Sequence, residues 1–246
     1  MENPTTINQD LEVEIIPEDY PTYDSSFKII VIGNQGKKNY INKKIIILGV
    51  GKSCLSIQAT KNVFQNNYLA TVGFEFFSFN IKINDQKIKL QIWDTCGQEL
   101  YRSLITNFYR NSSLAIIVYA VNQKESFDSI EMWLRELRTH SNPDAKVFLI
   151  ANKIDLTEQR KIKTEDGESY AKKNNLTKFM EASAKSGVNV QKIFIDAAKI
   201  LYDDYLLYNG NEDDSGSVKE HSFSSRPRPS FESEKKVYDT TKKGCC

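Results

Sequence analysis

Gly33-Asn-Gln-Gly36 and Val50-Gly-Lys-Ser53 are the two halves of a G-x4-G-K-[ST] phosphate loop. The first half follows Phe27–Ile32, an apolar run with the pattern of a buried parallel strand, and the second half opens a helix-like segment. In such a loop, glycines let backbone N–H groups point at a phosphate, Lys52 neutralises phosphate oxygens, and the Ser53 hydroxyl binds Mg²⁺. The positive end of the helix dipole adds to this attraction. The strand–loop–helix context therefore predicts a phosphate-binding site.

Thirteen residues, Lys37–Gly49, interrupt this motif, and Ile46 stands where a continuous loop would carry its first glycine. Their removal restores Gly-Asn-Gln-Gly-Val-Gly-Lys-Ser. The two ends of the insertion can be back-translated as splice sites. One hypothesis is therefore a retained in-frame intron, a gene-model or splicing artefact. The rival is a real surface loop, which we expect to splay the phosphate cradle.

Two segments compete for the central strand, residues 28–32 and residues 44–48. The first alone leaves Gly33-Asn-Gln-Gly36 available to start the loop. We therefore expect residues 28–32 to keep the strand and residues 37–48 to loop out toward solvent, because burying the four lysines of the insertion would be costly. Deletion of residues 37–49 is expected to raise stability and to restore tight nucleotide binding.

The composition excludes several classes of protein. The 33 basic and 32 acidic residues give a net charge of +1, which does not favour a nucleic-acid binder. The 40% apolar content suffices for a packed core. Four Cys and two His are spread without metal-ligand spacing, so neither a disulfide scaffold nor a zinc site is expected. The longest apolar runs are far shorter than a membrane-spanning helix, and no secretory signal is visible, which indicates a cytosolic chain.

The chain divides into three parts by composition. Residues 1–26 are acidic, lack Lys and Arg, and predict a disordered extension. Residues 27–208 alternate strand-like and helix-like segments, among them a hairpin with its turn at Asn84-Asp-Gln86 and one helix from Glu125 to Thr139. This pattern predicts an α/β domain with a mostly parallel, six-stranded sheet, helices on both faces, and ligands at the carboxyl ends of the strands. Residues 209–246 are polar and predict a flexible tail.

A second set of residues suits the γ-phosphate end of a nucleotide. Asp94 follows a predicted strand and can hold Mg²⁺, Gly97 offers a backbone N–H without a Cβ, and Gln98 can orient an attacking water. Thr71 lies in a segment of little regular pattern and can ligate Mg²⁺, although a lone loop Thr more often caps a turn.

A third set suits a guanine base. In Asn152-Lys-Ile-Asp155, the Asp155 carboxylate can accept hydrogen bonds from guanine N1–H and the exocyclic amine, whereas adenine would leave it unpaired. Lys153 can lay its methylenes across the base. The backbone N–H groups of Ser183-Ala184-Lys185, about thirty residues later, can meet the guanine oxygen. A phosphate loop followed by both motifs is a specific signature of guanine-nucleotide binding.

The segment Phe27–Tyr208, less the insertion, resembles the Rab family of small GTPases. Lys89-Leu-Gln-Ile-Trp-Asp-Thr-Cys-Gly-Gln-Glu99 is similar to the Rab stretch KLQIWDTAGQE, and Thr71-Val-Gly-Phe-Glu-Phe76 is similar to its TIGVDF. The resemblance implies a P-loop GTPase domain that binds GTP or GDP with Mg²⁺ and hydrolyses GTP.

The resemblance assigns the following roles. The catalytic residues are Gln98 and Lys52, and the metal ligands are Ser53, Thr71 and Asp94. The nucleotide-binding residues are Gly33, Gly36, Val50, Gly51, Lys52, Ser53, Cys54, Phe64, Thr71, Gly97, Asn152, Lys153, Asp155, Ser183, Ala184 and Lys185, with Phe64 as the aromatic edge against guanine. Phe76, Trp93 and Phe108 match an effector-facing hydrophobic triad, although ordinary core packing is an equal reading for Trp93.

The resemblance also implies a membrane switch in vesicle traffic. Cys245-Cys246 matches a double geranylgeranylation site, which would anchor the chain to the cytoplasmic face of an endomembrane, with a cytosolic pool. Lys242 and Lys243 add a weak attraction to anionic lipid. The implied partners are effectors, an exchange factor, a GTPase-activating protein, a GDP-dissociation inhibitor and a prenylation escort.

Three departures from the Rab pattern bear on activity. Cys96 replaces an Ala and is small enough to be tolerated, Gln35 replaces a Ser or Thr and can obstruct hydrolysis, and the insertion puts nucleotide binding in doubt. A Rab-like binding protein impaired in nucleotide binding is therefore the main alternative. A P-loop ATPase or nucleotide kinase is disfavoured by Asn152-Lys-Ile-Asp155, and a preference for ATP over GTP would revive it.

Overall fold

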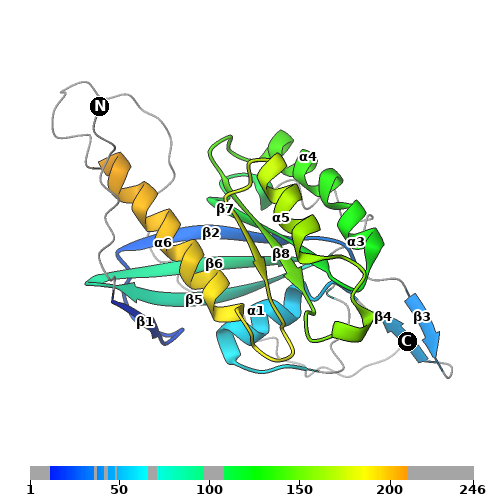
Figure 1. Cartoon of the computed structure of the whole chain (residues 1–246). Coiled ribbons are helices and arrows are strands. Elements are labelled where there is room, and N and C mark those ends of the chain that lie inside the picture. Colours follow the sequence, from blue (N-terminus) through cyan, green and yellow to red (C-terminus); the bar gives the residue numbers. More distant parts are fainter. Residues whose placement is uncertain are drawn as a thin grey trace, which may run out of the picture.

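A computed structural model describes residues 12–35, 38–41, 44–47, 49–65, 71, 73–96 and 108–209. In these residues one mixed sheet has seven strands in the order β1-β5-β6-β2-β7-β8-β9 (Figure 1). Four of its six neighbouring pairs are parallel, and the pairs β1–β5 and β5–β6 are antiparallel. The strands are β1 (Val13–Ile16), β2 (Ser25–Ile32), β5 (Phe74–Ile83), β6 (Gln86–Thr95), β7 (Leu114–Ala120), β8 (Lys146–Asn152) and β9 (Lys178–Glu181). The predicted α/β class is confirmed, with seven strands in place of six.

The central strand is β2, as the sequence predicts. It pairs in parallel with β6 on one side and with β7 on the other, and its residues 29–32 are all at most 1% exposed. The competing segment forms β4 (Lys44–Ile47), which pairs with β3 (Lys38–Ile41) in a separate antiparallel ladder. Figure 1 shows this hairpin outside the main sheet. The strand β2 has eight residues and supplies the buried apolar run Ile29–Ile32 to the core, whereas β4 has four residues and pairs with its neighbour in the chain, β3.

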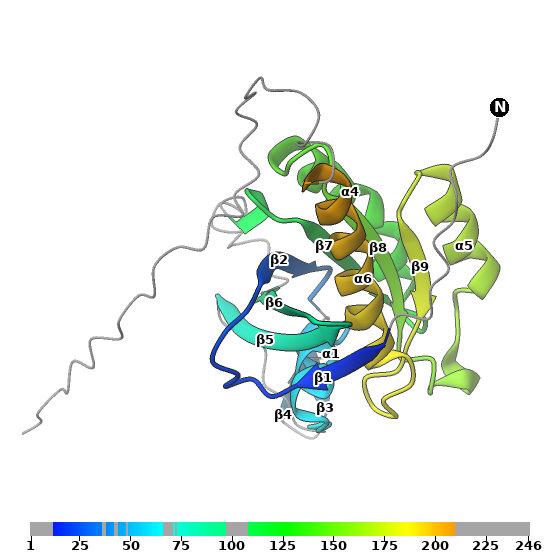
Figure 2. The same cartoon turned by 90° about the vertical axis from the view of Figure 1, so that its left-hand side faces the viewer.

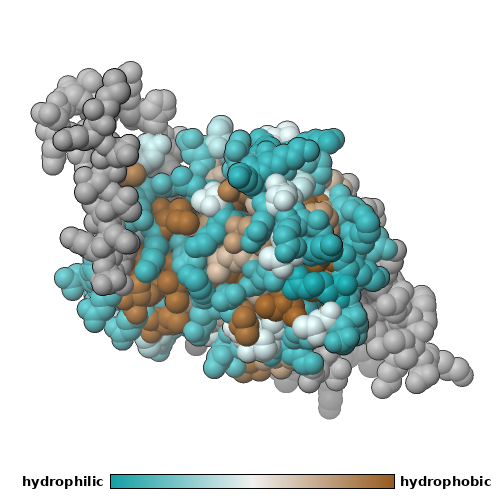
Figure 3. Space-filling view, viewed as in Figure 1, coloured by the Kyte–Doolittle hydropathy of each residue, from teal (hydrophilic) through white to brown (hydrophobic). Residues whose placement is uncertain are grey.

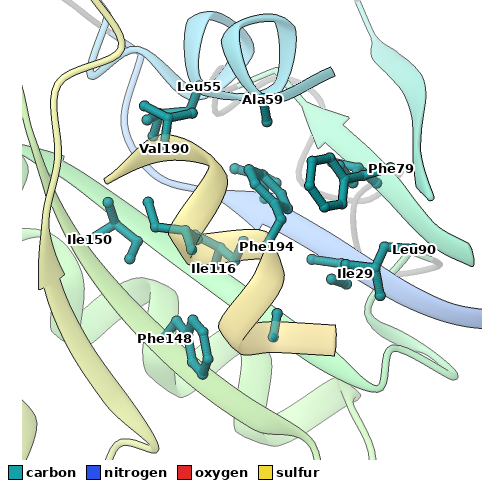
Figure 4. Packing of buried hydrophobic residues seen from close by; sticks show 14 of the residues in the cluster. Ile29, Leu55, Ala59, Phe79, Leu90, Ile116, Phe148, Ile150, Val190 and Phe194 are labelled. Carbon is teal, nitrogen blue, oxygen red and sulfur yellow. The ribbon is translucent and has the colours of Figure 1, made fainter. Parts of the chain in front are cut away.

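Helices cover both faces of the sheet. One face packs against α1 (Lys52–Lys61) and α6 (Val190–Asn209), where the rings of Phe194 and Phe79 lie 5.6 Å apart. Figure 4 shows Phe194 beside Phe79, near Ile116 and Ile29 of the central strands. The other face packs against α3 (Lys124–Asp128), α4 (Ile130–His140) and α5 (Thr164–Lys173). The short 3₁₀ helix η2 (Thr157–Gln159) connects β8 to α5.

Two details of the helices differ from the sequence-based expectation. The segment from Glu125 to Thr139, predicted as one helix, is divided at Ser129 into α3 and α4. The Ser129 hydroxyl bonds to the Glu125 carbonyl at 2.7 Å, a local bond that competes with regular helix geometry. The last helix runs to Asn209, slightly beyond the expected end of the domain. Among the described residues, no helix combines the length and apolar character that crossing a bilayer requires.

The expected disordered extension, residues 1–26, is wrong for its second half. Val13–Ile16 forms β1, which pairs antiparallel with β5 from Ile83 to Asn80 and adds the seventh strand (Figure 2). Ile16 is buried, whereas Ile15 is 42% exposed. Figure 3 shows apolar side chains gathered over the region of β1 and β5. The acidic composition of this segment predicts disorder and so conceals the strand. Glu14 is exposed at the sheet edge, where its charge remains in water and does not oppose strand formation.

Asn80 holds the segment that follows β1. Its buried side-chain amide donates to the carbonyl oxygens of Pro17 at 2.8 Å and Glu18 at 3.1 Å, and its Oδ1 accepts from the Ser78 hydroxyl. Nearby, the ammonium group of Lys89 lies 4.7 Å from the centre of the Tyr23 ring. These contacts hold residues 17–24 against β5 and β6, on the side of the sheet that carries Asn80 and Lys89.

Replacing Asn80 tests this attachment. Asn80→Ala removes four hydrogen bonds of a buried amide and should lower the free energy of unfolding by about 1–3 kcal/mol. Urea denaturation measures this loss, and limited proteolysis should show earlier cleavage before Ser25. Asn142→Ala, which alters an exposed turn, is the control. Equal stability of the two variants would show that the N-terminal segment is not held by Asn80.

Candidate functional site

The first half of the phosphate loop is fixed at the end of β2. Gly33 has φ +140°, and a Cβ there would lie 2.3 Å from the Val118 carbonyl oxygen of β7, so no other residue fits without a shift of backbone. The ammonium group of Lys52, at the start of α1, donates to the Gly33 carbonyl oxygen at 2.8 Å. Lys52 is buried, and burial lowers the pKa of its ammonium group. This bond joins the two halves of the loop across the insertion.

The second half of the loop is fixed by the end of β8. The side-chain amide of Asn152 donates to the Val50 carbonyl oxygen at 2.8 Å, and the Lys153 ammonium donates to the Gly49 carbonyl oxygen. Gly51 has φ +94° and caps the N-terminus of α1, with the Asn152 amide against it. Gly36, which the loop motif predicts in this cradle, lies outside the described residues. Gly49, counted as part of the insertion, is the glycine that contacts Lys153.

Three oxygen-bearing side chains converge beside Lys52. The Ser53 hydroxyl lies 2.7 Å from the Thr71 hydroxyl and donates a short hydrogen bond to Oδ2 of Asp94. All three side chains are buried, and Oδ1 of Asp94 has no hydrogen-bond partner within the described part of the chain. Burial raises the pKa of the Asp94 carboxyl to about 7, although the Lys52 ammonium and the Ser53 hydroxyl oppose this shift.

This arrangement suits Mg²⁺. The ion prefers oxygen ligands, retains several waters and commonly takes one or two carboxylates together with substrate phosphates. The partnerless Oδ1 of Asp94, beside two hydroxyl groups, offers such a ligand set. Phosphate oxygens of a nucleotide would complete such a ligand set. In the described residues there is no group of three or more His, Cys, Asp or Glu side chains suited to a metal.

The predicted base-binding residues meet at the ends of β8 and β9. Oδ1 of Asn152 accepts from the Ala184 backbone N–H at 3.1 Å, so this side chain links the base site to the phosphate loop. Oδ1 of Asp155 accepts from the Ser183 hydroxyl at 2.7 Å, and the same hydroxyl accepts from the Ser186 N–H. These bonds hold the Asp155 carboxylate in place.

The remaining predicted nucleotide-binding residues differ in their exposure to solvent, and some of them lie outside the described residues. Cys54 is half-buried in α1 and its thiol pKa is raised by burial, Phe64 packs against the core edge, and Lys185 is exposed. Gly36, Gly97 and Gln98 lie outside the described residues, as do Cys245 and Cys246.

The predicted hydrophobic triad forms part of a larger aromatic cluster. Ring centres lie 5.4 Å apart for Phe76 and Trp93, and 5.2 Å apart for Trp93 and Phe108. Phe74, which sequence analysis did not select, contacts both Trp93 and Phe108, and it is 49% exposed. The alternation of β5 could have identified it, because Phe74 and Phe76 point to the same face.

The strand–loop–helix cradle, the hydroxyl–carboxylate cluster and the side chains of the β8 and β9 ends define a phosphate-loop nucleotide-binding domain. A family model described as "Ras family" matches residues 44–203, about two thirds of the chain. The chain therefore belongs to the Ras family of small GTPases, whose members bind guanine nucleotides with Mg²⁺. The match begins at Lys44, within the insertion, so β1 and β2 lie outside it.

The raised pKa of Asp94 generates a pH prediction. Below about pH 7 the carboxyl holds a proton in the nucleotide-free protein, and Mg²⁺ has to displace it. The gain in affinity for the fluorescent nucleotide mant-GDP on adding Mg²⁺ should therefore grow from about pH 6 to about pH 8, by up to about tenfold per unit below the pKa. Asp94→Asn should abolish this gain.

Fluorescence titrations with and without Mg²⁺ at several pH values measure the effect. The control is Asp144→Asn, which changes an exposed carboxylate on the loop after α4. A Mg²⁺ effect of the same size at every pH would contradict the role given to Asp94.

Proposed function

We propose that this chain is a Rab-like molecular switch that binds GTP or GDP with Mg²⁺ and hydrolyses GTP. The observation that carries the proposal is that both halves of the phosphate loop are held in place despite the insertion. Lys52 bonds to Gly33 of the first half, and Asn152 bonds to Val50 of the second half. The resemblance of residues 89–99 to the Rab stretch supports the subfamily.

Each group of side chains has a distinct task. Lys52 would neutralise phosphate oxygens, while the Asp94 carboxylate and the Ser53 and Thr71 hydroxyls would hold the metal ion. That ion would supply positive charge to offset the charge of the phosphates. Thr71 is the residue that connects this cluster to the segment before β5. We therefore expect a γ-phosphate to order this segment, and its loss to release it.

Guanine selection rests on Asp155. Its carboxylate is already held by the Ser183 hydroxyl, so it loses little freedom on accepting the two N–H groups of guanine. The Ala184 N–H is bonded to Asn152, which keeps this turn against the phosphate loop. Asp155→Ala therefore serves as the reference variant for loss of guanine-nucleotide binding.

Hydrolysis is assigned to Gln98, which would orient the attacking water. Unassisted hydrolysis is expected to be slow, on the order of 10⁻⁴ s⁻¹, and to need a GTPase-activating protein. Gln35 lies half-buried in the first half of the loop, and its bulk favours a still slower rate than a Ser or Thr would give.

The alternative is a Rab-like protein whose interrupted loop no longer binds nucleotide. Removing residues 36–48 or residues 37–49 leaves the same sequence, because each deletion spares one glycine before Val50. With both loop halves anchored separately, the full chain should bind mant-GDP within about tenfold of the deletion variant, a difference of about 1.4 kcal/mol.

Titration of mant-GDP into the full chain, the deletion variant and Asp155→Ala tests this prediction. Competition by unlabelled GTP but not by ATP is expected. Binding by the deletion variant together with none by the full chain would establish the impaired alternative. Preferential competition by ATP would overturn guanine specificity.

The proposed output is recruitment of effectors in vesicle traffic. The aromatic cluster Phe74, Phe76, Trp93 and Phe108 presents two half-exposed rings that suit an apolar effector surface. The exchange factor, the GTPase-activating protein, the GDP-dissociation inhibitor and the prenylation escort are carried over from the Rab resemblance.

Membrane attachment is proposed through geranylgeranyl groups on Cys245 and Cys246. Two lipid chains hold a protein stably where one holds it marginally. Changing both cysteines to Ser should move the protein from the membrane fraction of a cell to the supernatant. The control is Cys54→Ser, which keeps the Cys245-Cys246 pair intact. Equal membrane recovery of the double variant and the wild type would contradict this anchor.

A further inference from the structure

The side chain of Asn34 connects the phosphate loop to the α3–α4 junction. Its Oδ1 accepts from the indole N–H of Trp133 at 2.6 Å, and its Nδ2 donates to the Ser129 hydroxyl at 2.8 Å. The two partners lie 99 and 95 residues further along the chain. The link therefore joins distant segments of the fold.

The orientation of the Asn34 amide is fixed by chemistry. An indole N–H can only donate, so the amide oxygen has to face Trp133 and the amide nitrogen has to face Ser129. The Ser129 hydroxyl has its own hydrogen committed to the Glu125 carbonyl oxygen at 2.7 Å, which leaves its lone pairs for Asn34. Every group in this chain of bonds has a partner of the right kind.

The partners of Asn34 are themselves rigid. Trp133 belongs to α4, is 3% exposed, and packs in the core between this helix and the sheet. The short helix α3 is tied to the end of β7, where the Ser126 hydroxyl accepts from the Ala120 N–H at 3.1 Å and donates to the Gln123 carbonyl oxygen at 2.6 Å. A side chain held by this junction therefore holds the backbone at residue 34.

We propose that Asn34 is a positioning residue of the nucleotide site. A continuous phosphate loop is held in shape by its own short chain, whereas here 13 inserted residues separate the two halves. The second half has its own anchors in Asn152 and Lys153. Asn34 supplies the matching side-chain anchor for residues 33–35, so that their backbone faces the phosphates without support from the inserted segment. This inference rests on the proposed function.

The test compares Asn34→Ala, Trp133→Phe and the double variant in the full chain. Asn34→Ala should release mant-GDP roughly tenfold faster, because two hydrogen bonds that fix the loop are lost. Trp133→Phe keeps an aromatic ring at this position, although a smaller one, but loses the N–H donor and should give a smaller increase. The double variant should release mant-GDP no faster than Asn34→Ala, since both changes break one link. Thr139→Ala, at the other end of α4, is the control.

A second readout needs no nucleotide. In a ¹⁵N-labelled, nucleotide-free protein, the indole N–H signal of Trp133 should shift in Asn34→Ala and keep its wild-type position in Thr139→Ala. Ser129→Ala removes one of the two bonds without entering the core, and it should release mant-GDP at a rate between those of the wild type and Asn34→Ala.

The outcomes separate this inference from the proposed function. Unchanged mant-GDP release by Asn34→Ala, with normal binding by the wild type, would overturn the role of Asn34 alone. Strictly additive effects of the two substitutions would overturn it as well, because independent sites add. A wild-type chain that binds no mant-GDP would overturn both, whatever the indole signal shows.

Discussion

The bond between the Lys52 ammonium and the Gly33 carbonyl oxygen is the interaction on which the site depends. It joins the start of α1 to the end of β2 across 13 inserted residues, and it requires β2 to be the central strand. Gly33 permits the close approach because a Cβ would meet the Val118 carbonyl oxygen. Burial lowers the pKa of the Lys52 ammonium group, and the nearby Asp94 carboxylate opposes this shift. The cradle is thus assembled from two segments, each held by side chains that lie outside the insertion.

Because each half of the cradle has its own anchors, the sheet tolerates added segments both before and after β2. The inserted residues pair with each other as β3 and β4 and take no place in the main sheet. On the other side, β1 extends the sheet at the free edge of β5, and Asn80 fastens the chain that returns to β2. The strand β1 lies at the far edge of the sheet, away from the carboxyl ends of β2, β7 and β8, where the nucleotide residues gather. The insertion follows shortly after the carboxyl end of β2, beside these residues, and its two strands form a ladder of their own.

Much of this arrangement is predictable from the sequence, because its signals are local. The apolar run of β2, the turn at Asn84 and the motifs around Lys52, Asp94 and Asp155 each follow from short-range pattern. Three features are not predictable in this way. The strand β1 is concealed by its acidic composition and is stabilised by pairing with residues far along the chain. The break between α3 and α4 at Ser129 is linked to Asn34 by a hydrogen bond between residues that lie 95 positions apart in the chain, which no local pattern reveals. The hydrogen bond between Lys153 and the Gly49 carbonyl oxygen is also not predictable, because the sequence alone does not show whether Gly36 or Gly49 completes the phosphate loop.

Hydrogen exchange of the full chain, followed by mass spectrometry with and without GDP and Mg²⁺, tests the central claim most directly. As the central strand, residues 28–32 should have strongly protected backbone N–H groups in both states. Residues 33–35 and 49–53 should gain protection when the nucleotide is added. Fast exchange in residues 28–32, together with strong protection in residues 44–48, would contradict the account, because it would place the inserted segment in the centre of the sheet.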